Sequence, residues 1–407
     1  MFKINLLTTA CFLLFILVSC RSGERHDTMQ SYPIDSFEIP DAYLSERKDI
    51  PAFWINAVDE VNDFLAANVH SGTLEVIGKS AGGKPITAVI YGEQREGAGT
   101  TTFSGSLGFR DVRAYRGPDH DKTVYLGMAA VHGGEFEGIV GIVNLISVIE
   151  TGKDLRGMEW PDIRDVVTKL DRLILIPVVN PDGRQRIPLR MEEYRGTDYT
   201  VHEYLNTGGN PDGTIIGWPQ IKEFIPMDFS RPGFPGGYPN DAGVNIQHDD
   251  FFGSRQPETQ ALFDLAERER PDLIINMHTG AVHMLMHRPF AEPVLSSAFD
   301  GLFRYVHTGL ALHGLQNSKD TARESDPARS PMSVYNFDTA LNLHCGALSV
   351  VVESPSHGFS GKNSKGDTAF HSPEMLLEAQ LVCHREAMRF LAESGGRSKW
   401  TPGPESK

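Results

Sequence analysis

The chain has 407 residues and a mass of 45.0 kDa, and 40% of its residues are hydrophobic and 22% charged. This length suits one large or two ordinary domains, and the composition excludes a disordered or fibrous protein. A net charge of −15 argues against a nucleic-acid partner, because such binders neutralise phosphates with basic residues. The mean hydropathy of −0.26 excludes a multi-span membrane protein, and four cysteines are too few for a disulfide scaffold.

The first twenty residues predict export. Lys3 precedes an apolar run, and residues 17–20 (LVSC) resemble a bacterial lipobox, so that removal of residues 1–19 leaves Cys20 as a lipid-modified N-terminus. The alternative is an ordinary signal peptide that contains a cysteine. A lipid on Cys20 anchors a protein to a membrane without spanning it. Arg21 after the cysteine predicts sorting to the outer membrane, on its periplasmic side or at the cell surface.

Residues 20–45 lack periodicity and are expected to form a tether, after which predicted helices and strands alternate. Residues 196–242, rich in Gly and Pro, are expected to form a long irregular segment of the kind that walls a binding site. The expected helices cover 51–70, 135–149, 256–268, 299–315 and 373–392. The expected strands cover 74–77, 86–91, 124–131, 173–179, 273–277 and 347–352.

This alternation predicts an α/β fold with a mixed, mostly parallel sheet and helices on both faces. No linker interrupts the pattern, so we expect one catalytic domain at 46–395 and a polar tail at 396–407. Cys345 and Cys383 fall in this domain, either paired or as buried thiols.

Three predicted strands end in residues that can bind a metal or move a proton. His132 and Glu135 follow the strand 124–131, His278 follows 273–277, and Glu353 follows 347–352. Because ligand sites of such sheets lie at the carboxyl ends of strands, these side chains are expected to converge. Two histidines and one carboxylate are the protein ligands of an open catalytic zinc site. Such a zinc acidifies a bound water, and Glu353 is the natural general base.

Each of these residues also has an ordinary interpretation. A single His-x-x-Glu pair is weak evidence in a chain with 15 histidines, and a histidine such as His278 is more often a hydrogen-bonded polar residue than a ligand. Glu353 is harder to explain in this way, since a carboxylate after a buried strand needs a partner.

The order and context of these motifs resemble the M14 zinc carboxypeptidases. Six segments carry the resemblance, in this order: EVIGKS and GKPI within 75–86, AVHGGE at 130–135, VVNPDG at 178–183, SRQPETQA at 254–261, NMHTG at 276–280 and VVE at 351–353. The likeness extends over most of residues 74–390.

The resemblance implies an eight-stranded mixed sheet and one Zn²⁺ per chain, held by His132, Glu135 and His278. It implies a metallocarboxypeptidase (the EC 3.4.17 class) acting on peptides or cell-wall stem peptides. In that reaction a zinc-bound water is the nucleophile and Glu353 the base. By spacing, Arg195 matches the arginine that stabilises the oxyanion, with Arg190 as the second candidate.

Two further positions concern substrate binding. Tyr335 is the nearest match to a tyrosine that closes over the substrate. The family's carboxylate-binding segment, Gly-Val-Asp-x-Asn-Arg-Asn, here reads GVNIQHD at 243–249, so that Gln247 and His248 replace its Asn-Arg pair and Asn245 replaces its acid. Histidine cannot form the two-donor fork of an arginine. Either the substrate is therefore not a plain peptide C-terminus, or another arginine binds its terminal carboxylate. Candidates for that arginine are Arg184, Arg186 and Arg231.

Three other functions are weighed against this one. The first is a zinc N-acyl amino acid deacylase of the aspartoacylase and desuccinylase type, which has a similar early His-x-x-Glu. The second is a lipid-anchored binding protein that has kept the fold. The third is a serine hydrolase using Ser80, whose GKSAG sequence fits Gly-x-Ser-x-Gly, but a β-rich run follows it where a helix is needed. The oligomeric state stays open.

Overall fold

The computed structural model describes most of the chain after residue 36. The described residues are 37–97, 117–223, 226–281, 284–291, 293–315, 324–329, 332–333, 335–358, 360–362 and 368–400. The predicted signal peptide, Cys20 and most of the predicted tether lie outside them, so these remain predictions.

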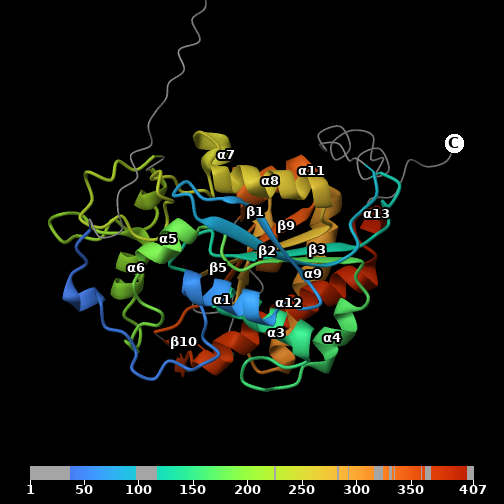
Figure 1. The fold of residues 1–407 in the computed structure, drawn as a ribbon, viewed down its shortest axis with the longest axis horizontal. Coiled ribbons are helices and arrows are strands. Elements are labelled where there is room, and N and C mark those ends of the chain that lie inside the picture. The colour runs from blue at the N-terminus through green and yellow to red at the C-terminus, as the bar shows by residue number, and fades with distance from the viewer. Residues whose placement is uncertain are drawn as a thin grey trace, which may run out of the picture. The chain divides into compact units, whose positions relative to one another are not determined.

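A seven-stranded sheet forms the centre of the fold, with the strand order β1-β2-β4-β3-β5-β9-β6 (Figure 1). Its strands are β1 (Thr73–Lys79), β2 (Pro85–Gly92), β3 (Val124–Ala129), β4 (Arg172–Ile176), β5 (Leu273–Ala281), β6 (Leu285–Met286) and β9 (Leu348–Pro355). The four middle strands β4, β3, β5 and β9 are parallel, whereas β1, β2 and β6 at the two edges pair antiparallel.

The predicted mixed α/β fold is therefore confirmed, with two differences in detail. The main sheet has seven strands among the described residues where eight were expected, and only three of its six pairings are parallel. Two small two-stranded sheets lie beside it. Their strands are β7 (Arg288–Pro289) with β8 (Met332–Ser333), and β10 (Ser360–Lys362) with β11 (Thr368–Phe370).

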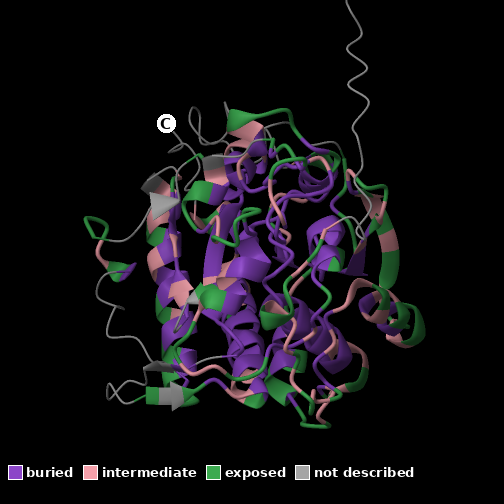
Figure 2. Cartoon of the chain, turned by 90° about the vertical axis from the view of Figure 1, so that its left-hand side faces the viewer, coloured by how far each residue is buried: buried purple, intermediate pink, exposed green. Residues whose placement is uncertain are grey.

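Helices cover both faces of the main sheet (Figure 1). On one face lie α1 (Val58–Asn68), α3 (Glu137–Thr151), α4 (Pro161–Val167), α9 (Pro293–Leu312) and α12 (Pro373–Ser394). On the other lie α8 (Pro257–Glu269) and α11 (Phe337–Cys345), with the single turn α7 (Asp249–Phe252) beside them. Figure 2 shows that buried residues follow the strands and the inner sides of these helices. The middle strands are buried on both sides, which explains their continuous apolar sequences.

Local sequence explains where the elements begin. At α12, Ser372 is the N-cap and accepts a hydrogen bond from the Met375 N–H, and Pro373 occupies the first turn, where its missing N–H costs nothing. Ser80 lies in the tight turn between β1 and β2, and its hydroxyl donates to Asp182 at 2.6 Å. The β-rich run expected after Ser80 is therefore β2 of an antiparallel hairpin, and the Gly-x-Ser-x-Gly match is not a strand-to-helix nucleophile turn.

Several helices lie outside the predicted ones. Asn180 caps the short helix α5 (Pro181–Arg186) by accepting from the Gly183 N–H. The segment 196–242 contains α6 (Thr200–Thr207) and the 3-10 turn η4 (Gln220–Glu223). Both are short and surrounded by Gly and Pro, which hid their periodicity.

Both ends of the described chain pack on the body. Tyr43, within the predicted tether, stacks on Tyr204 with ring centroids 3.7 Å apart. In the predicted tail, the turn α13 (Arg397–Trp400) packs as well, because Trp400 stacks on Phe390. The domain limits 46–395 therefore remain a prediction.

Cys345 and Cys383 are both buried and no disulfide joins them, which resolves the alternative left open by the sequence. None of the described helices combines the length and the apolar character that a membrane crossing requires.

Candidate active site

Three buried side chains converge at the carboxyl ends of β3 and β5. After β3, Ala130 adopts a left-handed conformation (φ 55°), which turns the chain before His132. Glu135 follows His132 after one turn, and His278 lies within β5. Their potential ligand atoms all lie within 4.8 Å of one another, so the structure brings together the three residues that the sequence singled out.

The donor geometry fits a metal ion. Glu135 faces both rings, with Oε1 2.8 Å from His132 Nδ1 and Oε2 3.0 Å from His278 Nδ1. On its other side His132 places Nε2 3.1 Å from Asn245 Oδ1, and an Nε2–H that donates to this oxygen leaves the Nδ1 lone pair for a metal ion. Two imidazole nitrogens and a carboxylate suit zinc and leave one coordination position for a reacting group.

The charges at this cluster favour a cation. Burial alone would raise the pKa of Glu135, but the two histidines hold it well below its usual range. Burial lowers the pKa of His132 despite Glu135, whereas for His278 the carboxylate outweighs burial and raises the pKa to about 9. A bound divalent ion would replace the proton on His278.

The two glycines between the ligands are needed for close packing. A Cβ on Gly133 would lie 2.0 Å from the Arg184 backbone nitrogen, and one on Gly134 would lie 2.5 Å from Asn206 Oδ1. The segment 180–184 and helix α6 can therefore pack directly on the His132–Glu135 turn only because these residues lack side chains. This gives the His-Gly-Gly-Glu sequence a physical reason.

Glu353 lies next to His278 on the neighbouring strand, since the two are register partners of β9 and β5. Its side chain is 25% exposed, which leaves it accessible from the cleft. Burial, with Glu135 adding to it, raises the pKa of Glu353 to about 7, although His278, Lys222 and His202 oppose the shift.

A cleft of about 400 Å³ opens beside the cluster. Thr279, Gly280, Leu285 and Glu353 line it from the sheet and Glu135 lines it from the turn after β3, and the remaining wall is one face of α6 with two loop aromatics. The residues of that wall are Tyr199, His202, Glu203, Asn206, Thr207, Trp218 and Tyr238. Tyr238 also stacks on His132, with ring centroids 3.7 Å apart.

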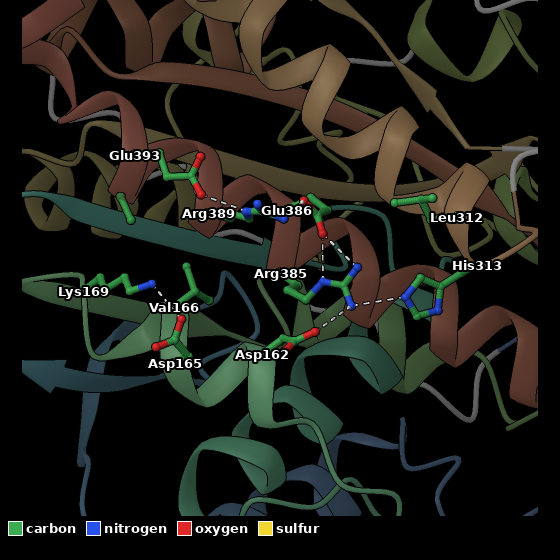
Figure 3. Close-up of a pocket in the computed structure, with 11 residues that line it drawn as sticks. Asp162, Asp165, Val166, Lys169, Leu312, His313, Arg385, Glu386, Arg389 and Glu393 are labelled. Carbon is green, nitrogen blue, oxygen red and sulfur yellow. Dashed lines mark hydrogen bonds and ion pairs between the residues drawn. The ribbon is translucent and has the colours of Figure 1, made fainter.

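A second hollow, of about 480 Å³, lies between α4, α9 and the end of α12 (Figure 3). Its cations are already paired: Arg385 with Glu386 at 2.8 Å, Lys169 with Asp165 at 2.7 Å, and Arg389 with Glu393 at 2.8 Å. Since α12 starts near the end of β9 and ends beside Asp272 at the start of β5, this hollow lies at the opposite end of the strands from the cluster. We therefore assign the chemistry to the smaller cleft.

The arginines predicted for catalysis do not line the cleft. Arg195 reaches toward the Ala42 carbonyl oxygen at 3.4 Å, and Arg190 pairs with Glu60 at 3.1 Å. Spacing along an irregular segment could not fix the direction of these side chains. The alternatives Arg184 and Arg186 are buried and donate to backbone carbonyls, and Arg231 pairs with Asp228 on the surface. No arginine is among the described residues that line the cleft.

The substituted carboxylate-binding segment does not form a cationic clamp. Gln247 is buried and donates to Asp338 at 3.0 Å, so its amide serves the core. Burial, aided by Lys222, lowers the pKa of His248 to about 4, which leaves it neutral at pH 7. Tyr335 is 55% exposed with φ 52° and contacts Phe251 and Phe252, and it does not line the cleft.

Helix α6 is the part of the site that the sequence analysis missed. Tyr199, His202, Glu203 and Asn206 share one face of it, and the Asn206 amide approaches Glu135 Oε1 at 3.5 Å. The signal was present, because spacings of three and four residues place side chains on one side of a helix. It was overlooked since the surrounding Gly and Pro favoured an irregular chain.

A His-Glu-His metal cluster beside a carboxylate, at the carboxyl ends of the strands of a mixed sheet, defines a zinc-dependent hydrolase. The sequence matches the family model for zinc carboxypeptidases (peptidase family M14) over residues 62–331. This is more than half of the chain, which therefore belongs to that family and is a zinc metallocarboxypeptidase. The matched range includes His132, Glu135 and His278, and it ends before Glu353.

Solved structures with a similar fold include three carboxypeptidases. The metallo-carboxypeptidase from Burkholderia cenocepacia is 13% identical, with 82% of this chain and 68% of that chain covered and a TM-score of 0.49. The metallo-carboxypeptidase from Pseudomonas aeruginosa, in complex with (2-guanidinoethylmercapto)succinic acid, is 12% identical, with 82% and 68% covered and a TM-score of 0.49. Carboxypeptidase A from Helicoverpa armigera is 14% identical, with 86% and 76% covered and a TM-score of 0.45. A comparison with curated proteins gave no match.

Proposed function

We propose that this zinc metallocarboxypeptidase removes C-terminal residues from peptides or cell-wall stem peptides, with Glu353 as its general base. The observation that carries the proposal is the position of Glu353, in register with His278 and on the wall of the cleft beside the metal cluster. A base in this position can reach both the attacking water and the leaving amine nitrogen.

His132, Glu135 and His278 would hold the zinc, with Asn245 orienting His132. Zinc in such a site polarises the substrate carbonyl and lowers the pKa of water. Glu353 takes a proton from the attacking water as the new C–O bond forms. It then returns this proton to the amine nitrogen as the C–N bond breaks, and the second proton of the water passes from the new carboxyl group to the amine, which yields a carboxylate and an ammonium group.

The experiment is a screen of peptides, cell-wall stem peptides and N-acyl amino acids with the full chain, with and without a chelator. Hydrolysis that stops with the chelator and returns with zinc supports the proposal. The N-acyl amino acids test the deacylase alternative, which gains some weight because His248 is not a cationic clamp.

Two variants separate the mechanisms. Glu353→Gln should lower kcat by about 10²–10⁴-fold while one zinc per chain stays bound, and Ser80→Ala should keep the activity. Activity that survives Glu353→Gln would remove Glu353 from the mechanism. Activity that survives the chelator and is lost in Ser80→Ala would instead support a serine hydrolase.

We also propose that the protein is exported and anchored through a lipid on Cys20 to a bacterial membrane, which is the outer membrane because Arg21 follows the cysteine. The sequence LVSC at 17–20 supports this proposal. Mass spectrometry of the mature N-terminus should find a lipid-modified Cys20, and Cys20→Ser should release the protein from the membrane fraction. An unmodified N-terminus at another residue would contradict the anchor.

A further inference from the structure

Four buried ionisable side chains form a row outside the metal cluster. Glu137 Oε1 lies 2.6 Å from His357 Nδ1, and the other ring nitrogen of His357 lies 3.4 Å from Glu192 Oε1. The same Glu192 oxygen lies 3.6 Å from His202 Nδ1. Acid and imidazole therefore alternate along the row, and none of the four residues is more than 7% exposed.

The row joins three parts of the active site. Glu137 begins α3 directly after the ligand turn, His357 follows β9 four residues after Glu353, and His202 lies on α6. The buried end of the row is held by packing. The His357 ring stacks on Phe136 with centroids 4.9 Å apart, which fixes the ring that faces Glu192. The row therefore has one fixed, buried end and one end that lines the cleft.

The imidazole of His357 and the carboxylates beside it stabilise each other's charged forms. Burial opposes the charged form of His357, but Glu137 and Glu192 outweigh it and raise its pKa to about 10. Burial also opposes the charged form of Glu192, and the neighbouring histidines nevertheless lower its pKa to about 2. The His357 imidazolium thus stands between the carboxylates of Glu137 and Glu192, and the same Glu192 oxygen also faces His202.

His202 also has a distinctive place among the residues of the cleft. The other ionisable side chains that line it are three carboxylates, Glu135, Glu203 and Glu353, and two tyrosines. His202 is the one described lining residue that can carry a positive charge. Lys222 does not line the cleft, but its ammonium lies 4.8 Å from the ring centroid of Trp218, which does, and its charge acts on Glu353. Amide hydrolysis places negative charge on the carbonyl oxygen, and a peptide C-terminus is itself an anion, so this cleft needs a donor.

We infer that His202, backed by Glu192, is the residue that donates a hydrogen bond to an anionic oxygen of the substrate in this cleft. The inference rests on the proposed amide hydrolysis. With Nδ1 directed at Glu192, the Nε2–H on the other side of the ring makes the contact. Glu192, and His357 behind it, are positioning residues that hold the ring. His202 thus takes the role that the sequence predicted for Arg195.

The test uses two variants of the zinc-loaded full chain and one matched control. His202→Gln removes the imidazole, Glu192→Gln removes the carboxylate behind it, and His70→Gln makes the same change at an exposed histidine after α1. Steady-state kinetics are measured on a peptide and on its C-terminal amide. Calorimetry measures the affinity for a phosphonate peptide, a tetrahedral anion that resembles the transition state.

We expect His202→Gln to lower kcat/KM by about 10²–10³-fold and Glu192→Gln by about tenfold, with zinc content and His70→Gln unchanged. Imidazole added to His202→Ala should restore part of the rate, which a purely structural role would not allow. A fall in kcat with a parallel loss of phosphonate affinity identifies the developing oxyanion as the partner. A rise in KM on the free peptide, absent on its amide, identifies the terminal carboxylate.

The inference is overturned if His202→Gln keeps kcat/KM and phosphonate affinity within about twofold of the unsubstituted protein. If Glu192→Gln does not fold, His202→Gln decides alone. Failure of the proposed function would look different, since the unsubstituted zinc-loaded protein would then hydrolyse none of the peptides.

Discussion

Arg184 was one candidate for the substrate-binding arginine, and its surroundings predict a structural role. Its side chain is only 2% exposed, and its guanidinium makes four hydrogen bonds. They run to the Asn56 carbonyl oxygen at 2.9 Å, Asn56 Oδ1 at 2.7 Å, the Ile187 carbonyl at 2.8 Å and the Leu189 carbonyl at 2.9 Å. Its guanidinium carbon also lies 4.2 Å from the ring centroid of Phe136, the residue after Glu135. Arg184 thus ties the chain before α1 to the loop after α5, beneath the ligand turn.

The expected loss of unfolding free energy on replacing Arg184 follows from these contacts. A hydrogen bond contributes about 1 kcal/mol and more when one partner is charged, so four of them are worth roughly 4–6 kcal/mol. Removal of the buried charge recovers part of this free energy, because the buried guanidinium has lost its hydration. The same burial lowers the pKa of Arg184 to about 9. We therefore expect Arg184→Met to lower the free energy of unfolding by about 3 kcal/mol, a large part of the typical 5–15 kcal/mol.

The assay is urea unfolding of the metal-free chain, with the free energy taken by linear extrapolation. Arg195→Met is the matched control, because the Arg195 side chain makes one long hydrogen bond, to the Ala42 carbonyl oxygen at 3.4 Å, and should change stability by less than about 0.5 kcal/mol. A loss below about 1 kcal/mol in Arg184→Met, or an equal loss in both variants, would refute this reasoning.

Three further predictions concern the metal and the buried acids. Asn245→Ala should weaken zinc binding by about 10–100-fold in competition with a chelator, since it removes the acceptor for His132 Nε2. Asn245→Asp keeps an acceptor and should not weaken zinc binding. Equal zinc affinities in the unsubstituted protein and in both variants would contradict this role of Asn245. Burial raises the pKa of Glu258 to about 7, so the folded state holds this proton more tightly than the unfolded chain, and the protein loses that stability as the pH rises from about 4.5 through 7. Glu258→Gln should therefore gain stability relative to the unsubstituted protein by at least about 1 kcal/mol between pH 5 and pH 8, and a constant difference would show that the carboxyl is ionised throughout. Gly134→Ala should lose zinc affinity, because its Cβ would lie 2.5 Å from Asn206 Oδ1, and a variant that binds zinc normally would mean that α6 can shift.

The sequence predicted best what depends on regular strands. β3, β5 and β9 are continuous apolar runs, and a polar residue after each is placed by strand geometry alone, so His132, His278 and Glu353 could be expected to meet. This is why the order of short motifs was sufficient to locate the cluster.

Side chains on irregular segments could not be located in this way. The backbone N–H of Arg195 donates to the Gly358 carbonyl, and this contact fixes the chain from which the Arg195 side chain projects. The Gln247 side chain is directed inward by its hydrogen bond to Asp338. Gly358 and Asp338 lie far from these residues in the sequence. The row from Glu137 to His202 joins residues up to 220 positions apart, such as Glu137 and His357. No spacing rule connects these residues, because they meet only after the sheet and α6 have packed.

The measurement that tests the account most directly is the location of the metal. X-ray absorption at the zinc edge, combined with metal analysis of the purified full chain, gives the number and type of ligands and the stoichiometry. We predict one zinc per chain, with two imidazole nitrogens and carboxylate oxygen as its protein ligands, and loss of this zinc in His132→Ala and in His278→Ala. Zinc that remains bound in both variants, or a ligand set without two histidines, would contradict the account.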